Sequence, residues 1–229
     1  MDEQIFPQIR AALPAIVGQE KRMRHILGVE AEAAALAKLF CAAGLLRDEE
    51  AQKLRLGALV HDLTKTKTTE EQLALCREYG IAVDARLAHS PKLLHAYTAG
   101  PYAARCFGEA LIDADVQRAV RYHTTGRAGM DLLEKLLFLA DYIEAGRTWP
   151  ACVALRAEFW RPETWNLDGA ALSEHLDTVL IHALDRTLSE LVEQEQLIDP
   201  DTVAARNALM LCKQIKEETD RKIAEKENA

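Results

Sequence analysis

Apolar residues recur every three or four positions through most of the 229-residue chain. Such spacing places them along one face of an α-helix. One stripe of this kind consists of Ile26, Val29, Ala33, Leu36 and Phe40. The alternation of apolar and polar residues that marks a half-buried strand is scarce, whereas the helix formers Ala and Leu are abundant. The pattern predicts an all-α fold.

Helix boundaries are indicated by capping residues and by helix breakers. Ser90 followed by Pro91 is typical of a helix start, and Thr68 or Thr69 can cap a short helix. The segment 130–144 is apolar around most of its circumference, which predicts a central, buried helix. The predicted helices cover residues 21–43, 49–62, 70–79, 91–106, 113–123, 130–144, 168–194 and 199–218.

The character of the sequence changes after Gly146. The pairs Trp149–Pro150 and Arg161–Pro162 predict turns, and two long helices with polar faces follow them. We therefore expect one main domain in residues 1–167 and a C-terminal helical extension, residues 168–229, that packs on the same domain.

Composition and charge restrict the classes of partner. A hydrophobic fraction of 49% and a charged fraction of 28% are ordinary for a globular protein. The formal net charge of -8 argues against bulk binding of nucleic acid or of an anionic membrane. An anionic substrate would therefore need local positive charge, supplied by metal ions or by a few converging basic side chains.

Cysteine spacing and the N-terminus bear on the cellular compartment. The five cysteines are widely spread and include no Cys-x-x-Cys pair, so reduced, buried thiols are expected. The first ten residues lack the apolar core of a signal peptide, and no segment approaches the ~18 apolar residues of a membrane span. We expect a cytoplasmic protein that does not bind membranes.

Imidazole and carboxylate groups occur at the ends or on the buried sides of successive predicted helices. When each helix of a bundle offers one or two such groups to a shared cavity, they can bind iron, manganese or zinc. The candidate metal ligands are His25, His61, Asp62, His95, His123 and Asp141.

The adjacent pair His61–Asp62 lies where the apolar run of its helix stops. Neighbours in the middle of a helix point about 100° apart, but at a helix end both can serve one site. A carboxylate has two oxygens, so Asp62 could join two metal ions while His61 binds one. Asp141 interrupts an apolar stretch, where an unpaired carboxylate would be costly and a metal would satisfy it.

Each of these residues alone also has an ordinary structural explanation. His25 can be a simple helix histidine, and Asp141 can pair with Arg121 or Arg147. The occurrence of all six in one helical array is what favours the metal site. The histidines without comparable context, which we interpret as structural, are His89, His175 and His182.

Basic and hydroxyl groups next to the candidate ligands could hold an anionic substrate. Lys65 follows Asp62 by three residues, and Arg147 lies about two helical turns beyond Asp141. Both are candidates for stabilising phosphate oxygens in a transition state. Thr124, Thr125 and Gly126 are candidates for a phosphate-binding loop. Exposure, an ion pair or a plain helix-stopping turn would explain the same residues.

Four sequence strings resemble the HD superfamily of metal-dependent phosphohydrolases, and within it the YqeK-type family of symmetrical diadenosine-tetraphosphate hydrolases. The strings are LVHDLTK at 59–65, SPKLLHAYTAG at 90–100, YHTTG at 122–126 and FLADYIEAGR at 138–147. The resemblance implies an HD-domain helical bundle. One departure is Ala145, at a position where the family pattern suggests proline.

The resemblance also implies a di-iron centre and a role for each candidate. His25, His61, Asp62 and Asp141 would bind the first ion, and His95 and His123 would bind a second ion that shares Asp62. Iron is the expected metal, with manganese or zinc as alternatives. The residues expected around the phosphates are Lys65, Thr124, Thr125 and Arg147.

We hypothesise that two metal ions activate a bridging water, which attacks an inner phosphorus of the dinucleotide and releases two nucleoside diphosphates. An HD phosphohydrolase acting on mononucleotides is an alternative, because the first-metal ligands alone would permit it. A nucleotide-binding regulator without turnover is another. The long C-terminal helices are compatible with a homodimer.

Overall fold

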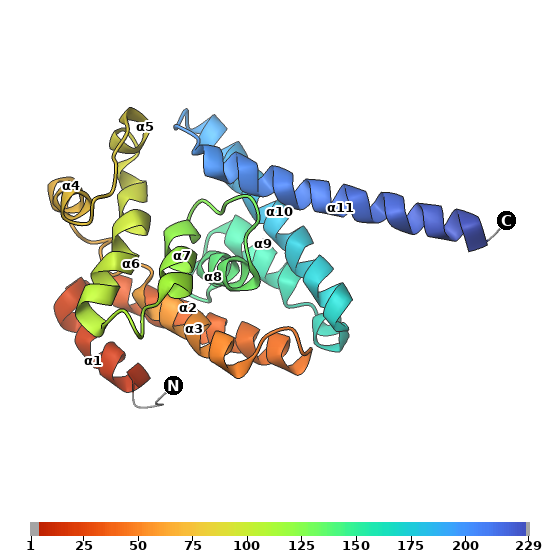
Figure 1. The fold of residues 1–229 in the computed structure, drawn as a ribbon, viewed down its shortest axis with the longest axis horizontal. Helices are drawn as coiled ribbons and strands as arrows, with labels where there is room; N and C mark the ends of the chain where they lie inside the picture. The colour runs from red at the N-terminus through yellow and green to blue at the C-terminus, as the bar shows by residue number, and fades with distance from the viewer. Residues whose placement is uncertain (1–4, 228–229) are drawn as a thin grey trace.

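Helices account for 76% of the computed structural model, which describes residues 5–227. Between these limits the chain forms α-helices and two short 3-10 helices, with no strand, so the all-α prediction is confirmed (Figure 1). The first half contains α1 (Ile5–Val17), α2 (Glu20–Ala42), α3 (Asp48–Val60), α4 (Thr69–Glu78), α5 (Ala85–Ala88), η1 (Pro91–Leu93) and α6 (Leu94–Phe107). The second half contains α7 (Ala114–Tyr122), α8 (Leu132–Ile143), α9 (Pro150–Phe159), η2 (Pro162–Asn166), α10 (Gly169–Glu193) and α11 (Pro200–Glu227).

Helix α3 lies at the centre of the bundle, in contact with α2, α6, α7 and α8. Helix α2 also packs on α8, and α7 packs on both α6 and α8. Leu136, Leu137, Leu139 and Ala140 of α8 are fully buried, as expected for a helix that is apolar on most sides. Four helices that carry candidate ligands are thus packed against α3, whose end carries the His61–Asp62 pair.

Several helix boundaries follow the predicted signals. Thr68 caps α4 by accepting a hydrogen bond from the Glu71 backbone, and Glu71 completes a capping box. The segment that starts at Pro91 first forms the 3-10 helix η1, so the α-helix begins only at Leu94. Helix α11 continues to Glu227, beyond the predicted end at 218.

Three α-helices, α1, α5 and α9, and the 3-10 helix η2 were not predicted. Helix α1 contains Pro14, which obscures its pattern, although its buried residues recur at helical spacing. At α9 the Trp149–Pro150 pair predicts a turn. Pro150 instead occupies the first turn of a helix, where its missing N–H costs nothing.

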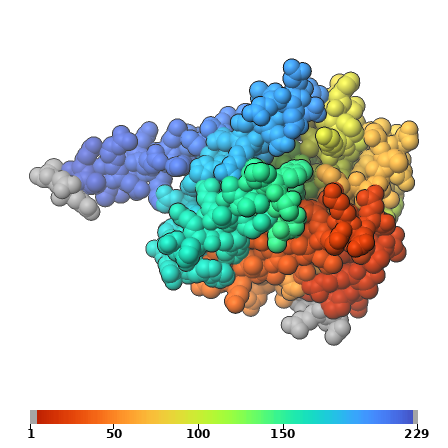
Figure 2. All heavy atoms as spheres, turned by 180° about the vertical axis from the view of Figure 1, so that it is seen from behind, coloured from red at the N-terminus to blue at the C-terminus, as the bar shows by residue number. Residues whose placement is uncertain are grey.

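The C-terminal helices extend the bundle on one side. Helix α10 packs against α8 and α9, and α11 packs along α10. The far part of α11 projects from the body of the molecule, as both views show (Figures 1 and 2). Among residues 5–227, no helix is both long and apolar enough to cross a membrane. All five cysteines lie within residues 5–227 and are free, as predicted, but only Cys76 and Cys152 are buried, whereas Cys106 and Cys212 are exposed.

Candidate metal centre

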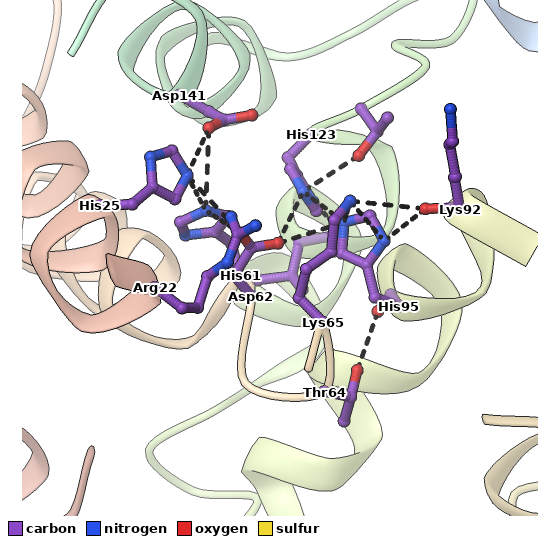
Figure 3. Close-up of polar contacts among 12 residues, drawn as sticks. Arg22, His25, His61, Asp62, Thr64, Lys65, Lys92, His95, His123 and Asp141 are labelled. Atoms are coloured by element: carbon purple, nitrogen blue, oxygen red, sulfur yellow. Dashed lines mark hydrogen bonds and ion pairs between the residues drawn. The ribbon is translucent and has the colours of Figure 1, made fainter. Parts of the chain in front are cut away.

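Five helices bring the six candidate ligands to one place. His25 projects from α2, His61 and Asp62 follow the end of α3, and His95 lies in the first turn of α6. His123 ends α7 and Asp141 lies on α8. Figure 3 shows the six side chains around Asp62, with Asp141 and His25 towards the left and His95 on the right.

Asp62 lies between two pairs of imidazoles. Its Oδ2 atom is 3.5 Å from Nε2 of both His25 and His61. Its Oδ1 atom is 3.2 Å from Nε2 of His95 and 3.9 Å from Nε2 of His123. The two oxygens of one carboxylate therefore face two different ends of the cluster.

Asp141 completes the first end of the cluster. Its Oδ1 atom is 3.0 Å from Nε2 of His25 and 3.8 Å from Nε2 of His61. Three overlapping groups have donor atoms that all lie within 4.8 Å of one another, the spacing of ligands around an ion. They are His25–His61–Asp62, His61–His123–Asp141 and Asp62–His95–His123.

The end of α3 explains how adjacent residues reach the same site. The helix ends at Val60, and His61 follows with helical backbone angles. The chain then enters tight turns in which the Leu63 N–H donates to the Val60 carbonyl and the Lys65 N–H donates to the Asp62 carbonyl. These turns let Asp62 point into the cluster beside His61.

The backbone orients three of the imidazoles in the same way. Nδ1 of His61 lies 2.7 Å from the Ala58 carbonyl oxygen, and Nδ1 of His123 lies 2.6 Å from that of Val120. Nδ1 of His95 lies 2.8 Å from the carbonyl oxygen of the residue three positions earlier. A carbonyl can only accept, so each Nδ1 carries the proton and each Nε2 presents a lone pair to the centre. This is the tautomer that a metal ion requires.

Burial keeps the imidazoles at the His95 end of the cluster neutral. His95 and His123 are almost fully buried. Burial holds the pKa of both below the usual range, and the nearby Lys65 ammonium lowers that of His95 further. Burial would also raise the pKa of Asp62, but His61 and His95 hold it well below the usual range, so the carboxylate stays ionised.

His25 behaves differently because carboxylates surround it. Burial lowers its pKa, but Asp141, Glu144 and Asp62 outweigh burial and raise the pKa to about 9. Its Nδ1 atom lies 3.2 Å from Oε1 of Glu144, and Nε2 faces Asp141. The side chain is 13% exposed, more than the other three imidazoles of the cluster.

Three cations border the cluster. Arg22 pairs with Asp62, and Arg147 donates to Oδ1 of Asp141 at 2.5 Å. The Lys65 ammonium lies 3.1 Å from both ring nitrogens of His95. Burial lowers the pKa of Lys65, although the nearby carboxylates oppose this shift.

Two neighbours of the cluster were not predicted from the sequence, Arg22 and Glu144. Arg22 precedes His25 by three residues, and Glu144 follows Asp141 by three. Side chains at this spacing share a helix face, so the spacing was a usable signal. Of the two arginines considered as partners of Asp141, Arg147 is the one in contact, whereas Arg121 pairs with Asp201.

The threonine loop lies beside the His123 end. Oγ1 of Thr124 is 3.0 Å from Nε2 of His123, and the buried Thr125 hydroxyl donates to the Gly126 carbonyl. The Gly126 N–H donates to the Tyr122 carbonyl, which closes the end of α7. Gly126 has a φ of 65°, a conformation that glycine adopts without strain.

The other three histidines have partners outside the cluster. His89 contacts the Ala85 carbonyl, and His175 contacts the Phe159 carbonyl. His182 lies 2.6 Å from Glu158 on an exposed part of α10.

The donor set fits a divalent metal. Inward-facing imidazole nitrogens and ionised carboxylates are ligands that iron, manganese and zinc share. Without a cation, the buried Asp62 and the partly buried Asp141 would depend on Arg22, Arg147 and neighbouring imidazoles for their charge balance. The cluster therefore has the chemistry of a metal centre.

Comparisons with known proteins agree with this chemistry. The family model described as "HD domain" matches residues 22–146, which include all six candidate ligands. In solved structures, a predicted HD superfamily hydrolase involved in NAD metabolism from Clostridium acetobutylicum is similar with a TM-score of 0.74 and 31% identity. The match covers 90% of this chain and 96% of that one.

Curated relatives are similar over most of their length. A symmetrical bis(5'-nucleosyl)-tetraphosphatase of Halalkalibacterium halodurans is 37% identical over 84% of this chain and 90% of the relative. Proteins of the same name from Bacillus subtilis and Staphylococcus aureus are 32% and 30% identical, over 83% and 82% of this chain and 90% and 86% of the relatives. The chain therefore belongs to the HD family of metal-dependent hydrolases, and within it to the family of the symmetrical bis(5'-nucleosyl)-tetraphosphatases.

Proposed function

We propose that the protein hydrolyses diadenosine tetraphosphate symmetrically to two molecules of ADP, and that two metal ions take part. The position of Asp62 is the observation that carries the proposal, because its two oxygens face two separate imidazole pairs. One carboxylate placed in this way suits two adjacent ions. The names of the three curated relatives support the substrate.

The two ions would have different ligands. The first would be held by His25, His61, Asp62 and Asp141, and the second by His95 and His123 together with Asp62. We propose iron as the metal, and the same donors suit manganese or zinc. Bound ions of this kind lower the pKa of a water molecule and offset negative charge on the substrate.

The protein's own cations would bind and orient the polyphosphate. Lys65 and Arg147 lie at opposite ends of the cluster, beside His95 and Asp141. A guanidinium has five N–H donors, so Arg147 can keep its contact with Asp141 and also donate to a phosphate oxygen. We assign phosphate binding to Lys65 and Arg147 and place the Thr124–Thr125–Gly126 loop next to the same phosphates.

The candidate ligands all lie in the part of the chain that we propose as the main domain, residues 1–167. We propose that residues 168–229 are an extension of this domain rather than an independent unit. The packing of α10 against α8 and α9 supports this view.

The metal content and the reaction products test the proposal together. Protein purified without oxygen is analysed for metals and incubated with diadenosine tetraphosphate, and the products are separated by chromatography. We expect two metal ions per chain and ADP as the sole nucleotide product. ATP together with AMP would show asymmetric cleavage. Release of phosphate from a mononucleotide, with the dinucleotide left intact, would favour the alternative mononucleotide phosphohydrolase, and binding without hydrolysis would favour the regulator.

A further inference from the structure

Two cavities adjoin the metal centre at opposite ends. The first has a volume of about 530 Å³ and is lined by His25, Glu144 and Arg147, all from the first end of the cluster. The second has a volume of about 450 Å³ and is lined by Lys65 and Thr124, which contact His95 and His123. Both volumes lie in the range of small-molecule sites.

The first cavity is strongly basic. Lys21, Arg22, Arg24 and Arg147 line it, and Glu144 is the acidic residue on its wall. Trp149 lies at the same cavity with 64% of its surface exposed. A cavity with this excess of positive charge suits a polyphosphate, and an exposed aromatic side chain offers a stacking surface.

The second cavity has a different chemistry on its far side. Its cations, Lys65 and Lys92, come from the segments that bear Asp62 and His95. The opposite wall carries Leu191 and Leu197, with two side-chain amides, Gln194 and Gln196, beside them. Apolar surface combined with neutral hydrogen-bonding groups suits a nucleoside better than a phosphate.

This far wall comes from the C-terminal part of the chain. It consists of residues 187–202, from the end of α10 to the start of α11, which lie outside the segment that the HD model matches. Ion pairs fix the wall in place: Arg86 of α5 pairs with the buried Asp199, and Arg121 of α7 lies 3.5 Å from Asp201. The wall is thus attached to the helices that surround the metal centre.

We propose that residues 187–202 complete a nucleoside subsite at the His95 end of the metal centre, and that the basic cavity at the His25 end receives the other half of the substrate. This inference rests on the proposed function. It explains symmetric cleavage in geometric terms, because a dinucleotide with one half at each end places the middle of its phosphate chain over Asp62. The C-terminal helices then contribute to substrate choice.

A double substitution on the wall tests the subsite. Leu191→Gln with Leu197→Gln removes apolar surface without adding charge. We expect KM for diadenosine tetraphosphate to rise by about tenfold while kcat changes little. Inhibition by inorganic tetraphosphate, which has no nucleoside, is expected to stay as in the unmodified protein. Val192→Gln is the matched control, since Val192 is adjacent in sequence, 63% exposed and not among the residues lining either cavity.

A second measurement separates this inference from the proposed function. Binding of AMP to the full-length protein, followed by calorimetry, needs no turnover and is expected to weaken in the double variant but not in the control. If the unmodified protein leaves the dinucleotide intact, the proposed function fails, yet AMP binding still tests the subsite. An unchanged KM and unchanged AMP binding in the double variant would overturn the inference. An equal loss of tetraphosphate inhibition would also overturn it, because the wall would then act on the phosphate site.

Discussion

The two ends of the metal centre use the same kind of ligand in opposite electrostatic settings. At one end His25 lies among Asp141, Glu144 and Asp62, which raise its pKa to about 9. At the other end His95 and His123 are buried, which lowers the pKa of both, and the Lys65 ammonium lowers that of His95 further. The comparison shows that burial and neighbouring charges together, rather than the ligand type, decide where a proton competes with a metal ion.

The largest effect is expected at Asp62, the residue common to both ends. Asp62→Ala removes the carboxylate that faces all four imidazoles, so bound metal and hydrolysis should be lost together, with turnover falling by about 1,000-fold or more. Metal analysis and the diadenosine tetraphosphate assay measure the two losses, and circular dichroism checks the fold. Full turnover in a metal-depleted variant would contradict the proposed mechanism.

Substitution of a ligand at one end should remove one of the two proposed ions and leave the other bound. His123→Ala leaves the ligands of the first ion intact, so metal content should fall from two ions to one. Turnover should fall by roughly 100-fold, because the remaining ion can still orient one part of the substrate. Metal content measured against protein concentration is the decisive quantity. Two ions retained in this variant would show that His123 is not a ligand.

The cations at the two ends are expected to have comparable effects. Lys65→Met and Arg147→Met should each lower kcat/KM by about 10- to 100-fold, because each removes charge that would stabilise phosphate oxygens. Metal content should stay close to that of the unmodified protein. Lys135→Met is the control, since Lys135 pairs with Asp177, away from the cluster. A loss confined to one of the two variants would show that the substrate uses one end only.

The raised pKa of His25 predicts a pH dependence of stability in the metal-free protein. Below about pH 6.5 His25 is protonated in both the folded and the unfolded state, so its stabilisation is fully present. As the pH rises towards 9, the unfolded state loses its proton first, and on the order of 2 kcal/mol of the free energy of unfolding should be lost.

Urea denaturation of chelator-treated protein at several pH values measures this loss. His25→Gln should flatten the profile between these limits, whereas His182→Gln on the exposed part of α10 should not. A His25→Gln profile with the same slope as the unmodified protein would contradict the assignment.

The smallest effect is expected in the loop next to the His25 end. Glu144 has φ and ψ of −54° and 148°, which suit a residue before proline. The Arg147 N–H donates to the Glu144 carbonyl, which places Ala145 at the second position of a turn, where proline is favoured. Ala145→Pro should therefore stabilise the protein by about 0.5 kcal/mol, and Ala145→Gly should destabilise it. Thermal denaturation measures both, and a lower Tm for Ala145→Pro would contradict the prediction.

Helix prediction succeeded where signals lie within one or two turns of the chain. The apolar stripe through Ile26 and Phe40 and the cap at Thr68 are such signals, and both describe real helices. It failed at α9, where proline was the main signal, since Pro150 can either break a helix or begin one. The choice depends on whether the segment can pack against other helices. Helix α9 does so against α8 and α10.

The six candidate ligands could be identified from the sequence because a histidine or carboxylate at a helix end or in an apolar stretch is visible in its local context. The arrangement of these ligands in space could not be identified from the sequence. Oδ1 and Oδ2 of Asp62 face different imidazole pairs, and Arg22 pairs with Asp62. These contacts join residues far apart in the chain. The sequence also left open which arginine pairs with Asp141, and the structure shows Arg147. Local sequence encodes helical periodicity and the chemical type of each side chain, whereas the packing of α2, α6, α7 and α8 around α3 decides which of those side chains meet.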